Sequence, residues 1–336
     1  MTVRWGIIGA GDIARKQTAR AIGTLPSARL QAVMRRDLQA ARAFAQEFGA
    51  ATAYSQVEEV LADPEIDAVY IATPVHLHAQ QTIAAAEAGK HILVEKPMAL
   101  STAECRAMLT ACRQHGVRLM VCYYQRFNAR HIKLRELVAD GAIGRVTMAQ
   151  ARQVLLYPPA PGLWRQSREQ AGGGALMDLG VHGIDTLRFI LGEVETVSAQ
   201  VATLAFDYPV DDTATLLLGF RGGIQGVVSV AFSVPSVEEV DYLEVCGTGG
   251  RLWTAPLHAK DSQGTLRLST PQGSQQYAFE QSTHQALIEA FDHSLEKGDP
   301  VPVPGEEGLQ GLAVVEAAYA SARTGQRISL TGSDPW

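Results

Sequence analysis

Short apolar runs alternate with amphipathic stretches along the first 122 residues of the chain. Strands alternating with helices of about 10–15 residues are typical of βαβ units, which build a parallel sheet between layers of helices. The runs predict strands at 3–9, 28–34, 52–54, 66–73, 91–97 and 117–124, and the stretches between them predict helices over 13–24, 38–48, 57–63, 76–88 and 101–115. We therefore expect an α/β, Rossmann-type dinucleotide-binding domain over residues 1–122.

The pattern changes after residue 123. A helix expected over 175–191 is followed by stretches in which apolar and polar residues alternate, such as VSAQVATLAF and DTATLLLGF, separated by turns rich in Gly, Asp and Pro. This alternation predicts strands with one buried and one exposed face, as in an antiparallel sheet. Residues 123–336 are thus expected to form an α+β domain with a large, mostly antiparallel open sheet that binds substrate and joins subunits.

Composition narrows the class of protein. The 336 residues suffice for about two domains, and 46% of them are hydrophobic, so a sizeable core is expected. A net charge of −6 argues against a nucleic-acid partner. The four cysteines form no CxxC pair and no Cys/His cluster, which predicts neither a disulfide framework nor a metal site. No apolar run approaches membrane-spanning length and the N-terminus lacks a signal peptide's pattern, so we expect a cytoplasmic protein with no membrane contact.

The sequence Gly9-Ala10-Gly11-Asp12-Ile13-Ala14 follows the first expected strand and opens the first expected helix. In a G-x-G-x-x-A loop the first Gly permits the tight turn, the second lets the backbone approach a pyrophosphate, and the small Ala lets the helix pack closely on the strand. The helix N-terminus offers N–H groups to the phosphates. An ordinary tight turn is the alternative, but the surrounding βαβ pattern favours dinucleotide binding.

The end of the second strand, Arg35-Arg36-Asp37, bears on which dinucleotide binds. Two guanidinium groups suit the 2′-phosphate of NADP, whereas an acidic residue here would contact the ribose of NAD. The arginines could also form a solvated turn, and Asp37 could instead cap the following helix. We expect NADP(H) to be preferred, with NAD(H) possible.

Two further groups carry candidate chemistry. Lys96 stands at the end of the fifth expected strand, where an open α/β sheet binds its ligands, and could polarise a carbonyl or hydroxyl oxygen; a solvated loop lysine is the alternative. Asp178, His182 and Asp185 are spaced to share one helix face, so a carboxylate could orient the imidazole. A purely structural polar network is the alternative there, and Gly172–Gly174 before the helix argue for close backbone approach to a ligand.

Several motifs at matching spacing resemble the Gfo/Idh/MocA oxidoreductase family across essentially the whole chain. They are GAGDIA at 9–14, TPVHLH at 73–78, AGKHILVEKP at 88–97, DGAIGR at 140–145 and AGGGALMDLGVH at 171–182. Within the family, the RWGIIGA start, the LLYPP segment before Trp164-Arg165, and VHGIDTLRFIL are most similar to a branch of NADPH-dependent sugar-ketone reductases.

The resemblance implies roles for particular residues. Lys96, Asp178 and His182 would be catalytic, and together with Asp185 they would bind substrate. The Lys96–Pro97 bond would be cis. The implied cofactor-binding residues are Gly9, Gly11, Asp12, Ile13, Arg35, Arg36, Thr73, Pro74, His78, Glu95, Lys96, Trp164 and Arg165.

The expected function is reversible hydride transfer between NADP(H) and a carbonyl or hydroxyl group of a sugar or related polyol. By analogy with relatives, the open sheet would pair subunits into a homodimer or homotetramer. Two other functions stay open: a glycosidase that uses tightly bound NAD for transient oxidation, and a non-catalytic NADP-binding regulator. Net NADPH oxidation with a ketose would distinguish the oxidoreductase from both alternatives.

Overall fold

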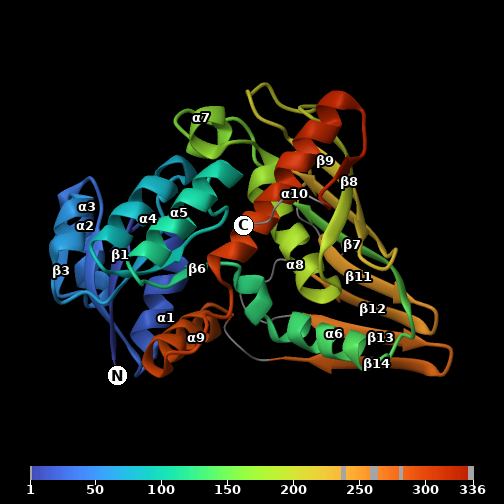
Figure 1. The fold of residues 1–336 in the computed structure, drawn as a ribbon, viewed down its shortest axis with the longest axis horizontal. Helices are drawn as coiled ribbons and strands as arrows, with labels where there is room; N and C mark the ends of the chain where they lie inside the picture. The colour runs from blue at the N-terminus through green and yellow to red at the C-terminus, as the bar shows by residue number, and fades with distance from the viewer. Residues whose placement is uncertain (1, 236–239, 258–263, 280–282, 332–336) are drawn as a thin grey trace. The chain divides into compact units, whose positions relative to one another are not determined.

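The computed structural model describes residues 2–235, 240–257, 264–279 and 283–331 (Figure 1). The chain divides into two units, one made of residues 1–123 and 284–309 and the other of residues 124–283 and 310–336.

The first unit is built on a six-stranded sheet in which every neighbouring pair of strands is parallel. The strand order is β3-β2-β1-β4-β5-β6, so the direction of winding reverses between β1 and β4, the place where such sheets bind ligands. The strands are β1 (Val3–Ile8), β2 (Ala28–Met34), β3 (Thr52–Tyr54), β4 (Ala68–Ile71), β5 (His91–Val94) and β6 (Leu119–Val121). The predicted Rossmann-type fold is confirmed.

Helical segments connect these strands, and local side chains fix where they begin. Ser101 caps α5 by accepting a hydrogen bond from the Glu104 backbone N–H at 3.2 Å, which satisfies a donor that the helix itself leaves open. The segments are the π-turn η1 (Ala14–Thr18), α1 (Ala19–Thr24), α2 (Leu38–Phe48), α3 (Val57–Ala62), η2 (Val75–Leu77), α4 (His78–Glu87) and α5 (Thr102–Gln114).

A late helix, α9 (Thr283–Lys297), also packs in the first unit. Asp292 on α9 accepts hydrogen bonds from the Trp5 indole at 3.0 Å and from the Ser27 hydroxyl at 2.9 Å, and the rings of Trp5 and Phe291 lie 5.5 Å apart. The sequence-based division assigned all of 123–336 to one domain. In the structure, residues 284–309 belong instead to the first unit, because Asp292 and Phe291 contact side chains near the start of the chain.

Burial of Asp292 makes the stability of the first unit depend on pH. Desolvation raises the pKa of this carboxyl to about 7, against the hydrogen bonds from Ser27 and Trp5. The folded state therefore holds the proton more tightly, and its stability is expected to fall as pH rises from about 4 through 7, by up to about 4 kcal/mol. Asp292→Asn keeps the polar contacts without the charge, so it should be more stable than wild type at pH 8 and equal to it near pH 4. Urea unfolding at both pH values measures the free energy of unfolding, with the exposed Asp299→Asn as control. An Asp292→Asn protein that is less stable than wild type at pH 8 would contradict the prediction.

The second unit is built on a nine-stranded sheet of order β14-β13-β12-β11-β7-β10-β9-β8-β15. Neighbouring strands are antiparallel except β7 and β10, which are parallel. The strands are β7 (Val146–Val154), β8 (Val194–Ala202), β9 (Thr213–Phe220), β10 (Gln225–Ala231), β11 (Tyr242–Gly247), β12 (Gly250–Ala255), β13 (Thr265–Thr270), β14 (Gly273–Ala278) and β15 (Ile328–Ser329). The expected large, mostly antiparallel sheet is confirmed.

Helices lie against one face of that sheet (Figure 1). On β9, for example, Leu216 and Leu218 are fully buried whereas Leu217 between them is 51% exposed, as the alternation predicts. The helical segments of this unit are η3 (Tyr124–Phe127), α6 (Ala129–Ala139), η4 (Trp164–Gln166), α7 (Arg168–Ala171), the π-turn η5 (Leu176–Gly180), α8 (Val181–Leu191) and α10 (Gly305–Thr324), whose first residues belong to the first unit. Within the described ranges, no helix is long and apolar enough to cross a membrane.

Candidate active site

The glycine loop after β1 has the geometry that a pyrophosphate site requires. Gly9 has φ of +90°, and a Cβ there would lie 2.8 Å from the backbone of Ala72 and Thr73, so only glycine fits. A Cβ on Gly11 would meet nothing closer than the Gly9 carbonyl oxygen at 3.9 Å. The backbone is therefore packed tightly behind Gly9 and open at Gly11, which fits the approach of a dinucleotide.

Asp12 and Ile13 open the helix that follows this loop. The exposed Asp12 carboxylate forms an ion pair with Lys16 one turn later, at 2.7 Å. The hydrogen bond from Lys16, more than any other contact, lowers the pKa of Asp12. The Lys16 ammonium thus offsets the charge of Asp12 at a helix N-terminus that would otherwise face phosphate with a bare carboxylate.

The charged residues at the end of β2 differ in their surroundings. The Asp37 carboxylate accepts hydrogen bonds from the backbone N–H groups of Gln39 at 2.9 Å and Ala40 at 3.1 Å, so Asp37 is the N-cap of α2. Arg35 and Arg36 precede it with exposed side chains. The helix-capping role expected of Asp37 is confirmed.

His78 connects the loop after β4 with the loop after β5. One ring nitrogen lies 2.9 Å from the Thr73 carbonyl oxygen and the other 3.0 Å from that of Pro97, and the side chain is buried. Desolvation is the main cause that lowers the pKa of His78. The expected cis bond between Lys96 and Pro97 is confirmed. His78 therefore ties the backbone at Thr73 to the backbone at Pro97.

Lys96 follows β5 and is half-buried, at the carboxyl end of the parallel sheet. Its backbone N–H donates to the Glu95 carboxylate at 3.1 Å, and the other oxygen of that carboxylate accepts from the Tyr70 hydroxyl at 2.6 Å. Burial first, and then the charge of Glu95, raise the pKa of Tyr70 well above its usual value, so this phenol stays a donor. Glu95 therefore serves to fix the backbone that carries Lys96.

In the second unit, three of the expected site residues lie together. The Arg165 guanidinium stacks on the Trp164 ring at 4.3 Å, and its Nε lies 3.5 Å from an Asp178 carboxylate oxygen. Asp178 sits in the π-turn η5, whose extra residue per turn widens the helix at this point. Arginine stacked on an aromatic ring and paired with a carboxylate is held in one orientation.

His182 and Asp185, on α8, have different surroundings. The His182 imidazole is buried and meets the Tyr124 ring edge-on, with ring centroids 5.3 Å apart. Asp185 is buried against Arg126, whose Nη2 and Nε lie 2.7 and 3.0 Å from one carboxylate oxygen. Helical spacing predicts one shared face for Asp178, His182 and Asp185, but Asp185 forms a buried ion pair with an arginine that lies far away in sequence.

Asp211 is a residue that the sequence analysis missed. Its carboxylate accepts hydrogen bonds from the backbone N–H groups of Gly174 at 2.9 Å and Leu176 at 2.8 Å, and from the Tyr319 hydroxyl at 2.7 Å. It therefore fixes the start of the helix that carries Asp178 and His182. The sequence gives no signal of this role, because Asp211 is one of two adjacent Asp residues in a loop and its partners lie far along the chain.

Asp211 also corrects the interpretation of the glycines before that helix. A Cβ on Gly174 would lie 1.8 Å from the Asp211 carbonyl oxygen, and one on Gly173 would lie 2.0 Å from the Tyr319 hydroxyl. The close approach at Gly173 and Gly174 is made by the protein itself, whereas the sequence suggested a ligand. Among the residues described, no group of three or more His, Cys, Asp or Glu side chains could hold a metal ion.

Comparison with known proteins decides the family. Residues 3–123 match the family described as "Oxidoreductase family, NAD-binding Rossmann fold", and residues 131–253 match "GFO/IDH/MocA C-terminal domain". A 1,5-anhydro-D-fructose reductase from Ensifer adhaerens is 33% identical over 97% of this chain and 98% of its own. The chain belongs to the Gfo/Idh/MocA oxidoreductase family. The resemblance to its sugar-reductase branch is likewise confirmed.

Other Gfo/Idh/MocA relatives agree along the whole chain. A protein named D-xylose 1-dehydrogenase (NADP(+)) 2, from Haloferax volcanii, is 31% identical over 97% of this chain and 99% of its own. The crystal structure of an aldose-aldose oxidoreductase from Caulobacter crescentus, complexed with glycerol, superimposes with a TM-score of 0.91 at 28% identity, covering 98% of this chain and all of that one. This Gfo/Idh/MocA member is therefore an NAD(P)-dependent oxidoreductase that acts on CH–OH groups, as the sequence predicts.

Proposed function

We propose that the protein is an NADP(H)-dependent oxidoreductase that interconverts a carbonyl and a hydroxyl group of a sugar or related polyol. The observation that carries the cofactor choice is that Asp37 caps α2, while Arg35 and Arg36 remain exposed at the tip of β2. The substrate class is supported by relatives named for anhydrofructose and xylose.

The residues of the first unit fit a bound dinucleotide. Gly9 and Gly11 would receive the pyrophosphate, with Asp12 and Ile13 at the helix start, and Arg35 and Arg36 would pair with a 2′-phosphate. When bound, the nicotinamide supplies or accepts the hydride. Thr73, Pro74, His78 and Glu95 would form the part of the cofactor site next to Lys96. In the second unit, Trp164 and Arg165 are the residues proposed to contact the cofactor.

The proposed chemistry assigns one task to each catalytic residue. In the reductive direction, His182 donates a proton to the developing alkoxide oxygen of the substrate, and the Lys96 ammonium stabilises the negative charge on that oxygen. Asp178, one turn before His182, holds the imidazole in the productive tautomer, and Arg165 keeps the Asp178 carboxylate oriented. Asp185 acts through Arg126 on the position of α8. In the oxidative direction, His182 takes the proton back.

The cofactor proposal predicts an effect of the two arginines. Replacing Arg35 and Arg36 by serine removes two charge-assisted contacts to the 2′-phosphate and is expected to weaken NADPH binding by about 10–100-fold. NADH binding should change by less than about threefold, because NADH has no such phosphate. Fluorescence titration measures the Kd of each cofactor, and the exposed Arg42→Ser on the following helix, α2, is the control. Equal losses for NADPH and NADH, or tighter binding of NADH to the wild type, would contradict the proposal.

We also propose that the exposed sheet face joins subunits into a homodimer or homotetramer. Leu217 on β9 is 51% exposed and Met148 on β7 is 42% exposed, although both lie within strands of the large sheet. Large exposed apolar side chains on a sheet are typical of surfaces that another chain covers. Sedimentation equilibrium measures the assembly state, and a monomer at micromolar concentration would refute the proposal.

A further inference from the structure

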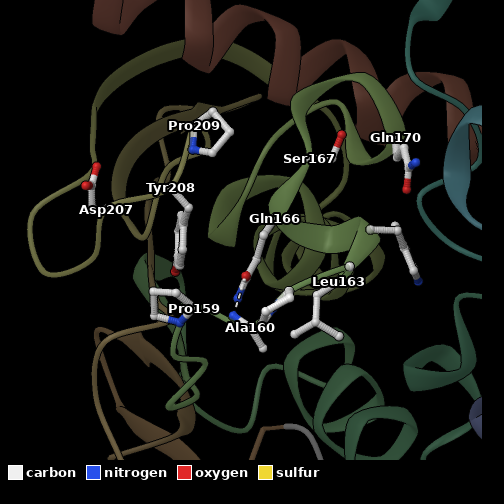
Figure 2. A pocket seen from close by; sticks show the side chains of 12 residues that line it. Pro159, Ala160, Leu163, Gln166, Ser167, Gln170, Asp207, Tyr208 and Pro209 are labelled. Carbon is white, nitrogen blue, oxygen red and sulfur yellow. Dashed lines mark hydrogen bonds between the residues drawn. The ribbon is translucent and has the colours of Figure 1, made fainter.

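A cavity of about 510 Å³ lies entirely within the second unit (Figure 2). The residues that line it come from two segments, 159–170 and 207–209. Its volume is within the range of about 300–1,000 Å³ that small-molecule sites occupy in proteins. None of the roles proposed above uses this cavity, except that Trp164 belongs to both. We call it the Tyr208 pocket.

Hydrogen bonds hold both walls of the Tyr208 pocket in place. The buried Gln166 amide donates to the Pro158 carbonyl at 2.9 Å and accepts from the Ala160 N–H at 3.0 Å, the contact drawn in Figure 2. On the other side, the Asp212 carboxylate accepts from the backbone N–H groups of Leu204, Ala205 and Phe206, at 2.9, 2.7 and 2.9 Å. These three bonds fix the turn that leads into Tyr208. The pocket is therefore preformed, which lowers the entropic cost of binding.

The chemistry of the lining indicates a neutral, hydroxyl-rich ligand. Trp164 and Tyr208 present aromatic rings, which suit the C–H faces of a sugar ring, while Ser167, Gln170 and Asp207 offer donors and acceptors to hydroxyl groups. The lining contains no Lys, Arg or His, and its one ionisable acid is Asp207. A phosphate or carboxylate ligand would meet a like charge at Asp207. The guanidinium groups that contact lining residues are already engaged, Arg165 with Asp178 and Arg168 with the Pro209 carbonyl oxygen at 3.2 Å.

The Tyr208 pocket adjoins the candidate catalytic residues of its own unit. The Trp164 ring that lines the pocket stacks with the Arg165 guanidinium at 4.3 Å, and Arg165 reaches Asp178 at 3.5 Å. A ligand in the pocket that contacts Trp164 would thus be separated from Asp178, the residue proposed to orient His182, by the stacked pair Trp164 and Arg165. This is the arrangement expected of a subsite for a part of the substrate that does not itself react.

We propose that the Tyr208 pocket binds a second, non-reacting sugar ring, so that the substrate is a neutral disaccharide or glycoside whose other ring is oxidised or reduced. This inference rests on the proposed function for the reacting ring. Binding of the second ring itself requires no turnover. The two can therefore be tested separately.

The binding test uses calorimetric titration of the protein with maltose, cellobiose, lactose and sucrose, and with D-glucose and D-xylose as single-ring probes. At least one disaccharide is expected to bind about tenfold or more tighter than either monosaccharide, and Tyr208→Ala should abolish that difference. Tyr208→Phe keeps the ring and should retain it, and the half-buried Tyr277→Ala on β14 is the matched control. Circular dichroism melting of each variant verifies that it is folded.

The kinetic test compares kcat/KM for the preferred disaccharide and for a monosaccharide with NADPH or NADP⁺. Tyr208→Ala is expected to lower the disaccharide value about tenfold and to leave the monosaccharide value within about twofold. Equal losses for both, or no disaccharide preference in the wild type, would overturn the second-ring proposal. Tyr208-dependent disaccharide binding without turnover of any sugar would instead support the pocket and refute the proposed function.

Discussion

Replacing His182 by asparagine is expected to lower kcat for sugar reduction by roughly 10²–10⁴-fold, the usual contribution of a general acid. Asparagine is smaller than histidine but keeps a polar group beside Tyr124, and it cannot deliver a proton to the alkoxide. The Kd for NADPH should change little, because the phosphate contacts proposed for the cofactor come from Gly9, Gly11, Arg35 and Arg36 and His182 makes none of them. Steady-state kinetics and fluorescence titration measure the two quantities.

Lys96→Ala should show the same split between turnover and cofactor affinity, since the ammonium stabilises charge that develops only during the reaction. The exposed His293→Asn on α9 is the control and should keep full activity. If both His182→Asn and Lys96→Ala keep near wild-type turnover, the assignment of the catalytic residues is wrong.

Gly174→Ala is expected to destabilise the second unit by about 3 kcal/mol or more. The new Cβ would lie 1.8 Å from the Asp211 carbonyl oxygen, a backbone atom that cannot rotate away. The same oxygen accepts a hydrogen bond from the Ala175 N–H at 2.8 Å, so relief of the clash breaks a buried contact at the start of the catalytic helix. Urea unfolding followed by tryptophan fluorescence measures the loss.

Gly23→Ala is the matched control for this substitution. Gly23 lies in α1, and a Cβ there would meet nothing within 4 Å, so the change should leave stability equal or raise it by up to about 1 kcal/mol. An unfolding midpoint of Gly174→Ala equal to that of Gly23→Ala would show that the glycine is not required by Asp211. That result would instead favour the expectation from the sequence, in which this glycine allows the backbone to approach a ligand.

Features that depend on neighbours in sequence could be predicted from the sequence. The six parallel strands follow from apolar runs with helices between them, and the Gly9 turn follows from a motif in its strand-to-helix context. The capping role of Asp37 could also be predicted, because the N–H groups that it binds lie only two and three positions further along the chain. Local periodicity and capping carry this information directly.

The features that could not be predicted depend on residues far apart in sequence. Asp185 meets Arg126 across 59 positions, and Asp211 meets Tyr319 across 108. Trp5 and Asp292 are 287 positions apart, which is why α9 could not be assigned to the first unit from periodicity alone. The π-turn η5 adds a further reason, because its wider turn changes which side chains share a face with Asp178.

Deuterium transfer from NADPH labelled at nicotinamide C4 tests the central claim most directly. The wild-type protein, incubated with labelled NADPH and a panel of anhydro-sugars, ketoses and inososes, is expected to yield one alcohol product heavier by a single deuterium, detected by mass spectrometry. Formation of that product should fall by roughly 10²–10⁴-fold in His182→Asn. Release of free sugar from an aryl glycoside without net NADPH oxidation, or NADPH binding with no deuterated product from any of these carbonyl compounds, would contradict the account.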